Sequence, residues 1–257
     1  MKYYANFLRK GCFTWEYVCR LAGNENTASN IIQRYLVEGL IRRVRRNLYI
    51  TINLTDGSPV ANEYVIASNI APGSYVSYHS AFSYYGFSNQ FLFEFYVSSP
   101  TKFNCFTYGG LKYRYIDSRM EQGIVTFPDG VTVTDLERTI IDSIDWFENI
   151  GGGIEELLEC LSVIPPVDEE KLRQYLDRYG KRVLYQKAGY ILEHFKGSMR
   201  LSQDFFDYCA SKVGGSVRYL HHAVKLYDPV FCKRWQLYVP EDLLYPLGQG
   251  SDPHEFI

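Results

Sequence analysis

The first part of the chain contains two short helical patterns, followed directly by a β-forming segment rich in arginine. Thr14 precedes an amphipathic run that stops at Gly23, which predicts a capped helix over residues 15–22. After a short turn, a second apolar stripe predicts a helix over residues 27–38. Two short helices joined by a tight turn are typical of a helix-turn-helix.

The outer face of the second predicted helix is polar but almost uncharged. At about 100° per residue, the face opposite the apolar stripe centres on three amide side chains with three polar residues beside them. These six residues are Asn26, Thr27, Ser29, Asn30, Gln33 and Arg34. Asn and Gln can bond adenine through two hydrogen bonds, and Arg can do the same with guanine. We therefore predict that this face reads the major groove of DNA, since a face serving only solubility would more often carry Glu and Lys.

Four arginines in five positions follow the second predicted helix. Arg42, Arg43, Arg45 and Arg46 lie in a β-branched and aromatic segment, residues 41–51, which predicts a hairpin with its turn at 45–47. Asn47 suits that turn because Asn tolerates positive φ better than most non-glycine residues. In a winged helix-turn-helix, such a wing follows the DNA backbone or enters the minor groove. We predict DNA contacts from the four arginines and Asn47, with Arg45 and Arg46 at the tip.

The charge distribution favours the same interpretation. Residues 1–50 carry nine Lys and Arg against three Glu, a net charge of +6, whereas the whole chain has a net charge of −2. A basic end joined to an acidic body is expected when one module neutralises phosphates. Two alternatives stay open: a basic face that is merely solvated, and a winged helix that serves protein contacts.

Length and composition indicate two or three packed units. The chain has 257 residues, of which 46% are hydrophobic. No apolar run approaches the roughly 20 residues that span a bilayer, and the N-terminus lacks a secretory apolar region, so a cytoplasmic protein is expected. Six scattered cysteines without a Cys-x-x-Cys pair indicate reduced, mostly buried thiols rather than a disulfide framework or a zinc site.

The predicted fold class is α+β, with three regions. A winged helix-turn-helix DNA-binding domain is expected over 1–58, a small mixed α/β unit over 60–150, and a mostly helical region over 151–257. In the middle region, helices are predicted at 63–70 and 79–85, strands at 75–77, 91–97, 102–108, 111–116 and 123–125, and a strand that runs into a helix over 129–142. In the last region, helices are predicted at 154–162, 168–179, 183–195 and 202–213, followed by an aromatic tail, 219–245, as strands or extended chain.

The polar residues that stand out in the middle region have structural explanations. Ser80 lacks the Gly-x-Ser-x-Gly context of a nucleophile, so helix packing is the prediction. Glu137 follows Thr134 at the spacing of a capping box, and Asp142 can pair with Arg138 one helical turn earlier.

No enzyme motif is recognisable. A nucleotidyltransferase needs Asp-x-Asp after a Gly-Ser turn, and Gly215-Ser216 is not followed by one. Glu169-x-Lys171 resembles part of a nuclease motif but falls in a predicted helix start, and there is no phosphate-binding Gly-x-x-x-x-Gly-Lys loop. The adjacent His221 and His222 cannot easily share a metal. The sequence predicts no catalytic residue, no metal and no cofactor.

Three segments with recognisable spacing lie at residues 39–49, 75–87 and 136–142, with a weaker fourth at 235–240. In these segments the chain resembles the AbiEi-type antitoxins of bacterial type IV toxin-antitoxin and phage-defence systems. The resemblance extends from the first helix to about residue 243. One departure is Asn47, where such proteins usually carry glycine in the wing turn.

The resemblance implies a DNA-binding transcriptional autorepressor that binds operator repeats of its own promoter. It further implies that residues from about 60 onward oppose a nucleotidyltransferase toxin, with or without a stable complex. The alternative is a winged-helix regulator or scaffold that acts through protein contacts without an antitoxin role.

Overall fold

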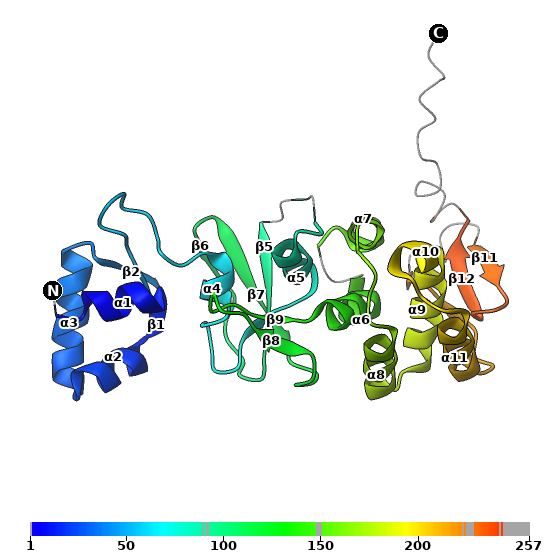
Figure 1. Cartoon of the computed structure of the whole chain (residues 1–257), viewed down its shortest axis with the longest axis horizontal. Helices are drawn as coiled ribbons and strands as arrows, with labels where there is room; N and C mark the ends of the chain where they lie inside the picture. The colour runs from blue at the N-terminus through cyan, green and yellow to red at the C-terminus, as the bar shows by residue number, and fades with distance from the viewer. Residues whose placement is uncertain are drawn as a thin grey trace, which may run out of the picture. The chain divides into compact units, whose positions relative to one another are not determined.

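The computed structural model describes residues 2–88, 90, 93–147, 151–222, 224, 229–241 and 243, and these form two compact units (Figure 1). The first unit comprises Met1–Tyr84 and Phe91–Asp135, and the second comprises Tyr85–Gln90 and Leu136–Ile257. Both combine helices with sheet, which confirms the predicted α+β class. The predicted limits near residues 59 and 150 each fall inside a unit, so the three-region division stays a prediction. In the ranges that the structure describes, every helix is too short or too polar to span a bilayer.

The first unit begins with three helices and a small antiparallel sheet. The elements are α1 (Tyr4–Lys10), β1 (Cys12–Thr14), α2 (Trp15–Ala22), α3 (Glu25–Val37), β2 (Ile41–Arg45) and β3 (Leu48–Thr51), with strand order β1-β3-β2. Both predicted helices and the hairpin are confirmed. The Thr14 side chain accepts a hydrogen bond from the Tyr17 amide, and Gly23 ends α2 with a φ of 83°.

Aromatic rings hold these elements together. Phe7 stacks on Phe13 with ring centroids 4.4 Å apart, and Tyr35 of α3 meets Phe7 edge-on at 5.7 Å. Phe13 also stacks on Tyr49 of β3, at 6.0 Å. Because all four rings are buried, α3 and the β2–β3 hairpin share one apolar core.

A six-stranded mixed sheet and two helices form the rest of the first unit. The helices are α4 (Glu63–Ala67) and α5 (Tyr78–Tyr85), and the strands are β4 (Tyr75–Val76), β5 (Glu94–Ser99), β6 (Phe106–Tyr108), β7 (Leu111–Asp117), β8 (Ile124–Thr126) and β9 (Thr132–Thr134). The strand order is β6-β7-β5-β4-β9-β8, in which β5 pairs with β7, and β4 with β9, in parallel. The predicted start of β5 includes residues 91 and 92, which lie outside the described residues. Ser80 packs as predicted, since its Oγ accepts a hydrogen bond of 2.9 Å from the Tyr96 amide in the sheet.

Two elements of this part are shorter than predicted. The helix predicted over 63–70 ends at Ala67, and the strand predicted over 102–108 begins only at Phe106. Phe103, in the segment just before β6, is instead a buried residue, and Arg45 lies over its ring.

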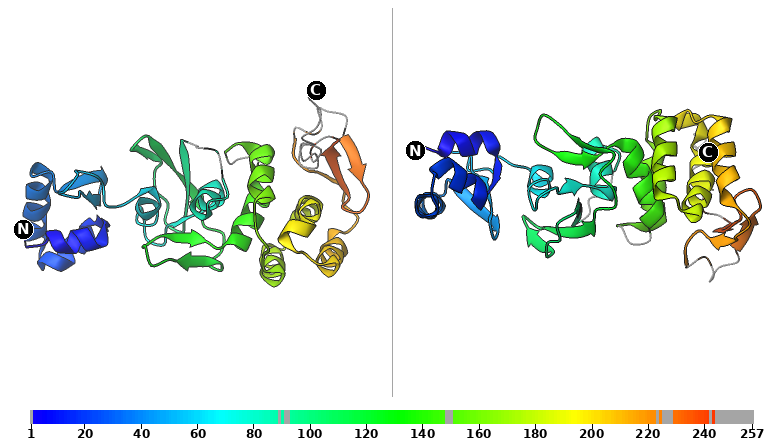
Figure 2. Two further views of the ribbon diagram at one scale, coloured as in Figure 1. Left: turned by 45° about the horizontal axis from the view of Figure 1, so that its top comes forward. Right: turned by 90° about the horizontal axis from the view of Figure 1, so that it is seen from below.

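The second unit is mostly helical, as Figure 2 shows. Its elements are α6 (Leu136–Trp146), α7 (Gly153–Ser162), α8 (Glu169–Tyr179), α9 (Arg182–His194), α10 (Lys196–Met199), α11 (Gln203–Val213), β10 (Arg218–Tyr219), β11 (Pro229–Cys232) and β12 (Leu237–Pro240). Helix α9 packs against α6, α8 and α11, and the described part of the aromatic tail forms a sheet of order β10-β12-β11. The four predicted helices of this region are confirmed within one or two residues, whereas α10 was not predicted.

The predicted capping box at α6 is wrong. The helix begins at Leu136, so Glu137 lies too early in it to bond back to Thr134. One carboxylate oxygen of Glu137 accepts the Asp168 amide at 2.9 Å, and the other lies 3.5 Å from Nζ of Lys171. Glu137 therefore ties α6 to the start of α8, a contact between segments that the local sequence pattern does not reveal.

Candidate nucleic-acid interface

The outer face of α3 is exposed, as the sequence predicted. Asn26, Asn30, Gln33 and Arg34 are exposed, and Thr27 and Ser29 are half-buried beside them. The opposite side buries Ala28, Ile32 and Tyr35. The Asn24 side chain caps the start of α3, since its Oδ1 accepts a hydrogen bond of 2.8 Å from the Thr27 amide.

One residue of this face already has a partner. The Nε of Arg34 lies 2.7 Å from an Oε1 of Glu38, one turn later on the helix, and both side chains are exposed. Such an exposed pair contributes little to stability, so Arg34 can exchange Glu38 for another acceptor at low cost. Arg34 is therefore available to a ligand such as a base edge or a phosphate.

The β2–β3 hairpin turns at Arg46 and Asn47. Asn47 has a φ of 64°, which confirms the predicted left-handed turn residue, and its carbonyl accepts the Trp15 amide at 3.1 Å. Arg42, Arg43, Arg46 and Asn47 are exposed. The pairing shifts between Arg43 and Arg45, so a bulge precedes the turn and changes the direction of the side chains beyond it.

Arg45 is placed differently from the other arginines of the hairpin. It is the last residue of β2, half-buried, and its guanidinium carbon lies 5.7 Å from the ring centroid of Phe103 and 5.0 Å from that of Phe106. Burial lowers its pKa. The prediction of Arg45 at an exposed tip is therefore wrong: Arg46 occupies the tip, because two aromatic residues distant in sequence cover Arg45.

A pocket of about 770 Å³ opens beside this hairpin, within the first unit. Its lining includes Arg45, Arg46 and Asn47, together with basic residues that the sequence did not single out: Lys10, Arg20 and Lys102. Lys10 and Arg20 belong to the basic N-terminal segment and could have been suspected from its charge. Lys102 gave no local signal, because it reaches the pocket only through the fold.

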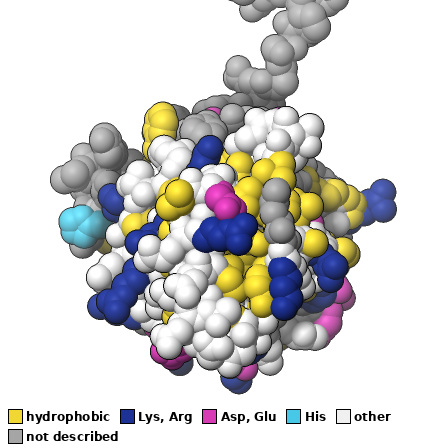
Figure 3. Space-filling model, turned by 90° about the vertical axis from the view of Figure 1, so that its left-hand side faces the viewer, with side chains coloured by type: hydrophobic (Ala, Val, Ile, Leu, Met, Phe, Trp, Pro, Cys, Tyr) yellow, Lys and Arg dark blue, Asp and Glu magenta, His cyan; other side chains and the backbone are white. Residues whose placement is uncertain are grey.

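Basic side chains are spread over the face that Figure 3 shows. Lys and Arg side chains stand there among apolar and uncharged polar ones, and Asp and Glu are sparser. This agrees with the charge of residues 1–50, which is strongly positive in a chain of net charge −2. A surface of this kind attracts polyanions over a distance of about 10 Å at ordinary salt.

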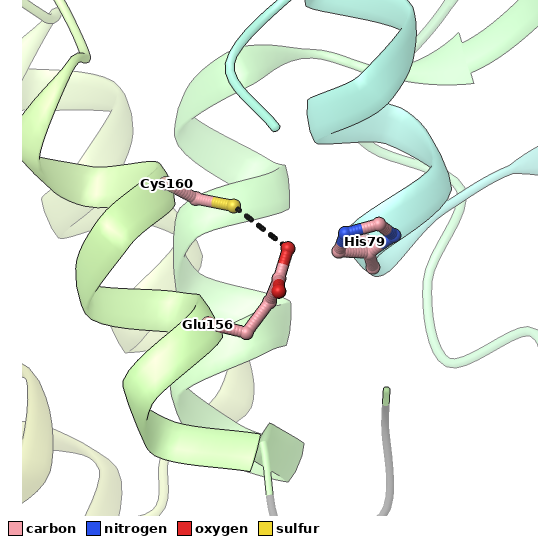
Figure 4. Close-up of side chains that lie close together, drawn as sticks. All are labelled: His79, Glu156 and Cys160. Carbon is pink, nitrogen blue, oxygen red and sulfur yellow. Dashed lines mark hydrogen bonds between the residues drawn. The ribbon is translucent and has the colours of Figure 1, made fainter. Parts of the chain in front are cut away.

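The buried thiols of the chain are poor nucleophiles. All six cysteines are free; Cys12, Cys160 and Cys209 are buried, and Cys105 is exposed. On α7, Sγ of Cys160 lies 3.9 Å from Oε1 of Glu156, one turn earlier (Figure 4). Burial, assisted by the carboxylate charge of Glu156, raises the pKa of Cys160 to about 12, so this thiol stays protonated at neutral pH.

The comparisons with known proteins identify a fold. No protein-family model matches the sequence, and no curated protein sequence matches it either. The structure is similar to the crystal structure of the RV2827C protein from Mycobacterium tuberculosis, with a TM-score of 0.62 and 14% sequence identity over 96% of this chain and 93% of that chain. At this level of identity, the chain shares the mixed α+β fold of that protein, and the likeness concerns the fold alone.

Proposed function

We propose that the chain is a DNA-binding transcriptional regulator, in which α1 to β3 act as a winged helix-turn-helix. The observation that carries the proposal is the exposed amide face of α3, centred on Asn30 and Gln33, followed at once by a hairpin with exposed arginines. In this arrangement α3 reads base edges in the major groove, and the hairpin is the wing that holds the backbone.

The electrostatics of the wing support this proposal. Among the described residues, Arg42, Arg43 and Arg46 form no ion pair with a carboxylate, so their charges are not neutralised within the chain. Each phosphate that such a side chain neutralises releases a condensed counterion, which makes affinity strongly dependent on salt. Arg43 is oriented by the ring of Tyr49, its cross-strand neighbour, at 5.6 Å.

We further propose that the protein is an antitoxin of a type IV toxin-antitoxin system that represses its own operon. This part rests on the resemblance to AbiEi-type antitoxins. In that role the bound protein occludes the promoter, while residues from about 60 onward oppose a nucleotidyltransferase toxin. The chain then acts without catalysis of its own, and without a metal or cofactor.

Binding of labelled duplex DNA from upstream of the gene, followed by fluorescence anisotropy, tests the DNA-binding role. Replacing Gln33 or Asn30 with Ala should reduce discrimination against unrelated DNA by about 1–3 kcal/mol. The pair Arg42→Ala and Arg43→Ala should weaken binding to all sequences and lower the salt slope by about 1 for each lost contact.

The matched control is Arg9→Ala, which removes an exposed charge from α1 outside the pocket and the wing. If the α3 and wing variants bind DNA as tightly as the Arg9→Ala variant does, the proposal fails and a scaffold acting through protein contacts is favoured.

Co-expression with a nucleotidyltransferase encoded in the same operon tests the antitoxin role. The wild-type chain should restore growth, and a Gln33→Ala, Arg43→Ala variant should lose repression of the promoter while still restoring growth. A wild-type chain that binds the promoter but leaves growth arrested would show a regulator without antitoxin activity.

A further inference from the structure

The pocket beside the wing is lined by five basic side chains and a single acidic one. The basic residues are Lys10, Arg20, Arg45, Arg46 and Lys102, and the acidic residue is Glu16. They come from α1, α2, the β2–β3 hairpin and the segment before β6, so separate parts of the first unit contribute charge to one cavity. Its volume of about 770 Å³ lies in the range of small-molecule sites, about 300–1,000 Å³.

These charges have little compensation among the residues that the structure describes. Within the part of the chain that the structure describes, none of the five basic residues forms an ion pair with a carboxylate. Like charges that converge on one cavity repel each other, and Glu16 offsets only one of them. An anion of two or more charges in the pocket would relieve this repulsion.

Arg45, which also lines this pocket, has a hydrogen-bond donor without a partner among the described residues. This donor is the buried Nη1. The rings of Phe103 and Phe106 hold the guanidinium in place, so less entropy is lost when it binds a ligand. A planar guanidinium fixed in this way suits the oxygens of a phosphate, which it can bond through two parallel N–H groups.

We propose that this pocket binds a phosphate-bearing ligand of nucleotide size. The phosphate oxygens accept hydrogen bonds from Arg45 and Arg46, and the charges of Lys10 and Lys102 complete the neutralisation. Two sources supply this chemistry: a free nucleotide, or the phosphodiester backbone of DNA that passes the wing. Arg46 and Asn47 belong both to the wing turn and to the pocket, so DNA held by the wing would pass the pocket. Only this second source rests on the proposed DNA-binding function.

Isothermal titration calorimetry with ATP and with inorganic pyrophosphate tests the free ligand, on the full chain and without DNA. We expect binding that Lys102→Ala weakens at least about tenfold and that the control Arg9→Ala leaves unchanged, since one phosphate contact contributes roughly 1.4 kcal/mol or more. Lys102 is exposed and lies outside every helix and strand, so its loss should not affect folding, which thermal unfolding of the variant checks.

Anisotropy with the upstream duplex tests the second source. If ATP and pyrophosphate do not bind but Lys102→Ala weakens DNA binding about tenfold, the pocket holds backbone phosphate. If Lys102→Ala changes neither ligand nor DNA binding, the inference is overturned. If the α3 and wing variants do not change DNA binding, the proposed DNA-binding function fails, but ATP should still bind to the pocket. Failure of the proposed function is therefore distinguishable from failure of the pocket proposal.

Discussion

The guanidinium carbon of Arg45 lies 5.0 Å from the ring centroid of Phe106, a residue 61 positions later in the chain. Because of this contact, two neighbouring arginines lie in different environments: Arg45 is half-buried at the end of β2, whereas Arg46 is exposed in the turn. Their substitution should therefore have different consequences for stability.

Arg46→Ala should leave stability unchanged within about 0.5 kcal/mol, because the side chain is exposed and makes no ion pair among the described residues. Arg45→Ala should reduce the free energy of unfolding by about 1–2 kcal/mol, because it removes a partly desolvated cation from two aromatic faces. Urea denaturation of both variants measures the difference. Equal stabilities would show that the ring contacts of Arg45 do not outweigh its repulsion from the other basic side chains of the pocket.

The turn of the wing offers a second test. Asn47 has a φ of 64°, where a β-branched side chain is strongly disfavoured. Asn47→Gly should therefore be tolerated, whereas Asn47→Val should lower the free energy of unfolding by about 1–2 kcal/mol. Thermal unfolding of both variants measures this. If Asn47→Val unfolds at the wild-type temperature, the turn does not require the left-handed conformation.

The parts of the fold that the sequence predicted well depend on local interactions. The cap of Thr14, the glycine stop at Gly23 and the turn at Asn47 act within a few residues, so a pattern of residue types was sufficient to place α2, α3 and the hairpin. The Arg138–Asp142 pair was also predicted correctly, since it spans a single helical turn, and Ser80 packs as predicted, with its Oγ accepting the Tyr96 amide.

The features that the sequence did not predict depend on distant contacts. Arg45 is covered by Phe106, Glu137 bonds to the start of α8, and Lys102 reaches the pocket beside the wing. Each of these residues has neighbours in sequence that suggest a different role. The partner of each residue lies far away in the sequence and comes close only in the folded chain. A local sequence pattern could therefore not predict these contacts.

The thiols provide a test of burial. Burial raises the pKa of Cys209 and of Cys12 to about 12, from an ordinary value of 9.0. Because these folded-state pKa values are raised, the stability that the protonated thiols contribute is complete below pH 9 and is lost as the pH rises from 9 to 12. The temperature of unfolding should therefore fall as the pH rises from 8.5 to 11. In a Cys209→Ala variant, the decrease from its own value at pH 8.5 should be smaller than the decrease in the wild type. An equal slope in both proteins would contradict the burial of Cys209.

The same burial predicts selective alkylation. At pH 8, a maleimide should label Cys105 in the folded protein much faster than it labels Cys12, Cys160 or Cys209, because only Cys105 is exposed. Mass spectrometry of proteolytic peptides identifies the labelled residue, and labelling in urea is the control that all the thiols can react. Rapid labelling of Cys160 in the folded protein would show that α7 opens readily.

The buried pair of α6 should be essential to the second unit. Nε of Arg138 lies 2.8 Å from both carboxylate oxygens of Asp142, and the Tyr179 hydroxyl also donates to this carboxylate. Asp142→Asn removes the negative charge that pairs with the buried Arg138 and should reduce the free energy of unfolding by about 3–5 kcal/mol. The double variant Arg138→Met, Asp142→Leu should recover part of this loss, measured by urea denaturation. If Asp142→Asn is as stable as the wild type, the pair is not desolvated.

Gly189 of α9 allows a close approach by Trp235. A Cβ at Gly189 would lie 2.1 Å from Cζ3 of Trp235, whose side chain is fully buried and whose Nε1 donates to Glu193 at 2.8 Å. The indole cannot move aside without losing that hydrogen bond, so Gly189→Ala should lower the free energy of unfolding by about 1–3 kcal/mol despite the better helix propensity of alanine.

The matched control for this substitution is Gly197→Ala in α10, where a Cβ would meet no atom within 4 Å. It should be neutral or stabilising by a few tenths of a kcal/mol, roughly. Combining Gly189→Ala with Trp235→Leu removes the clash, so the double variant should be less destabilised than the sum of the two single variants. Additive losses in thermal unfolding would show that Trp235 does not pack against Gly189.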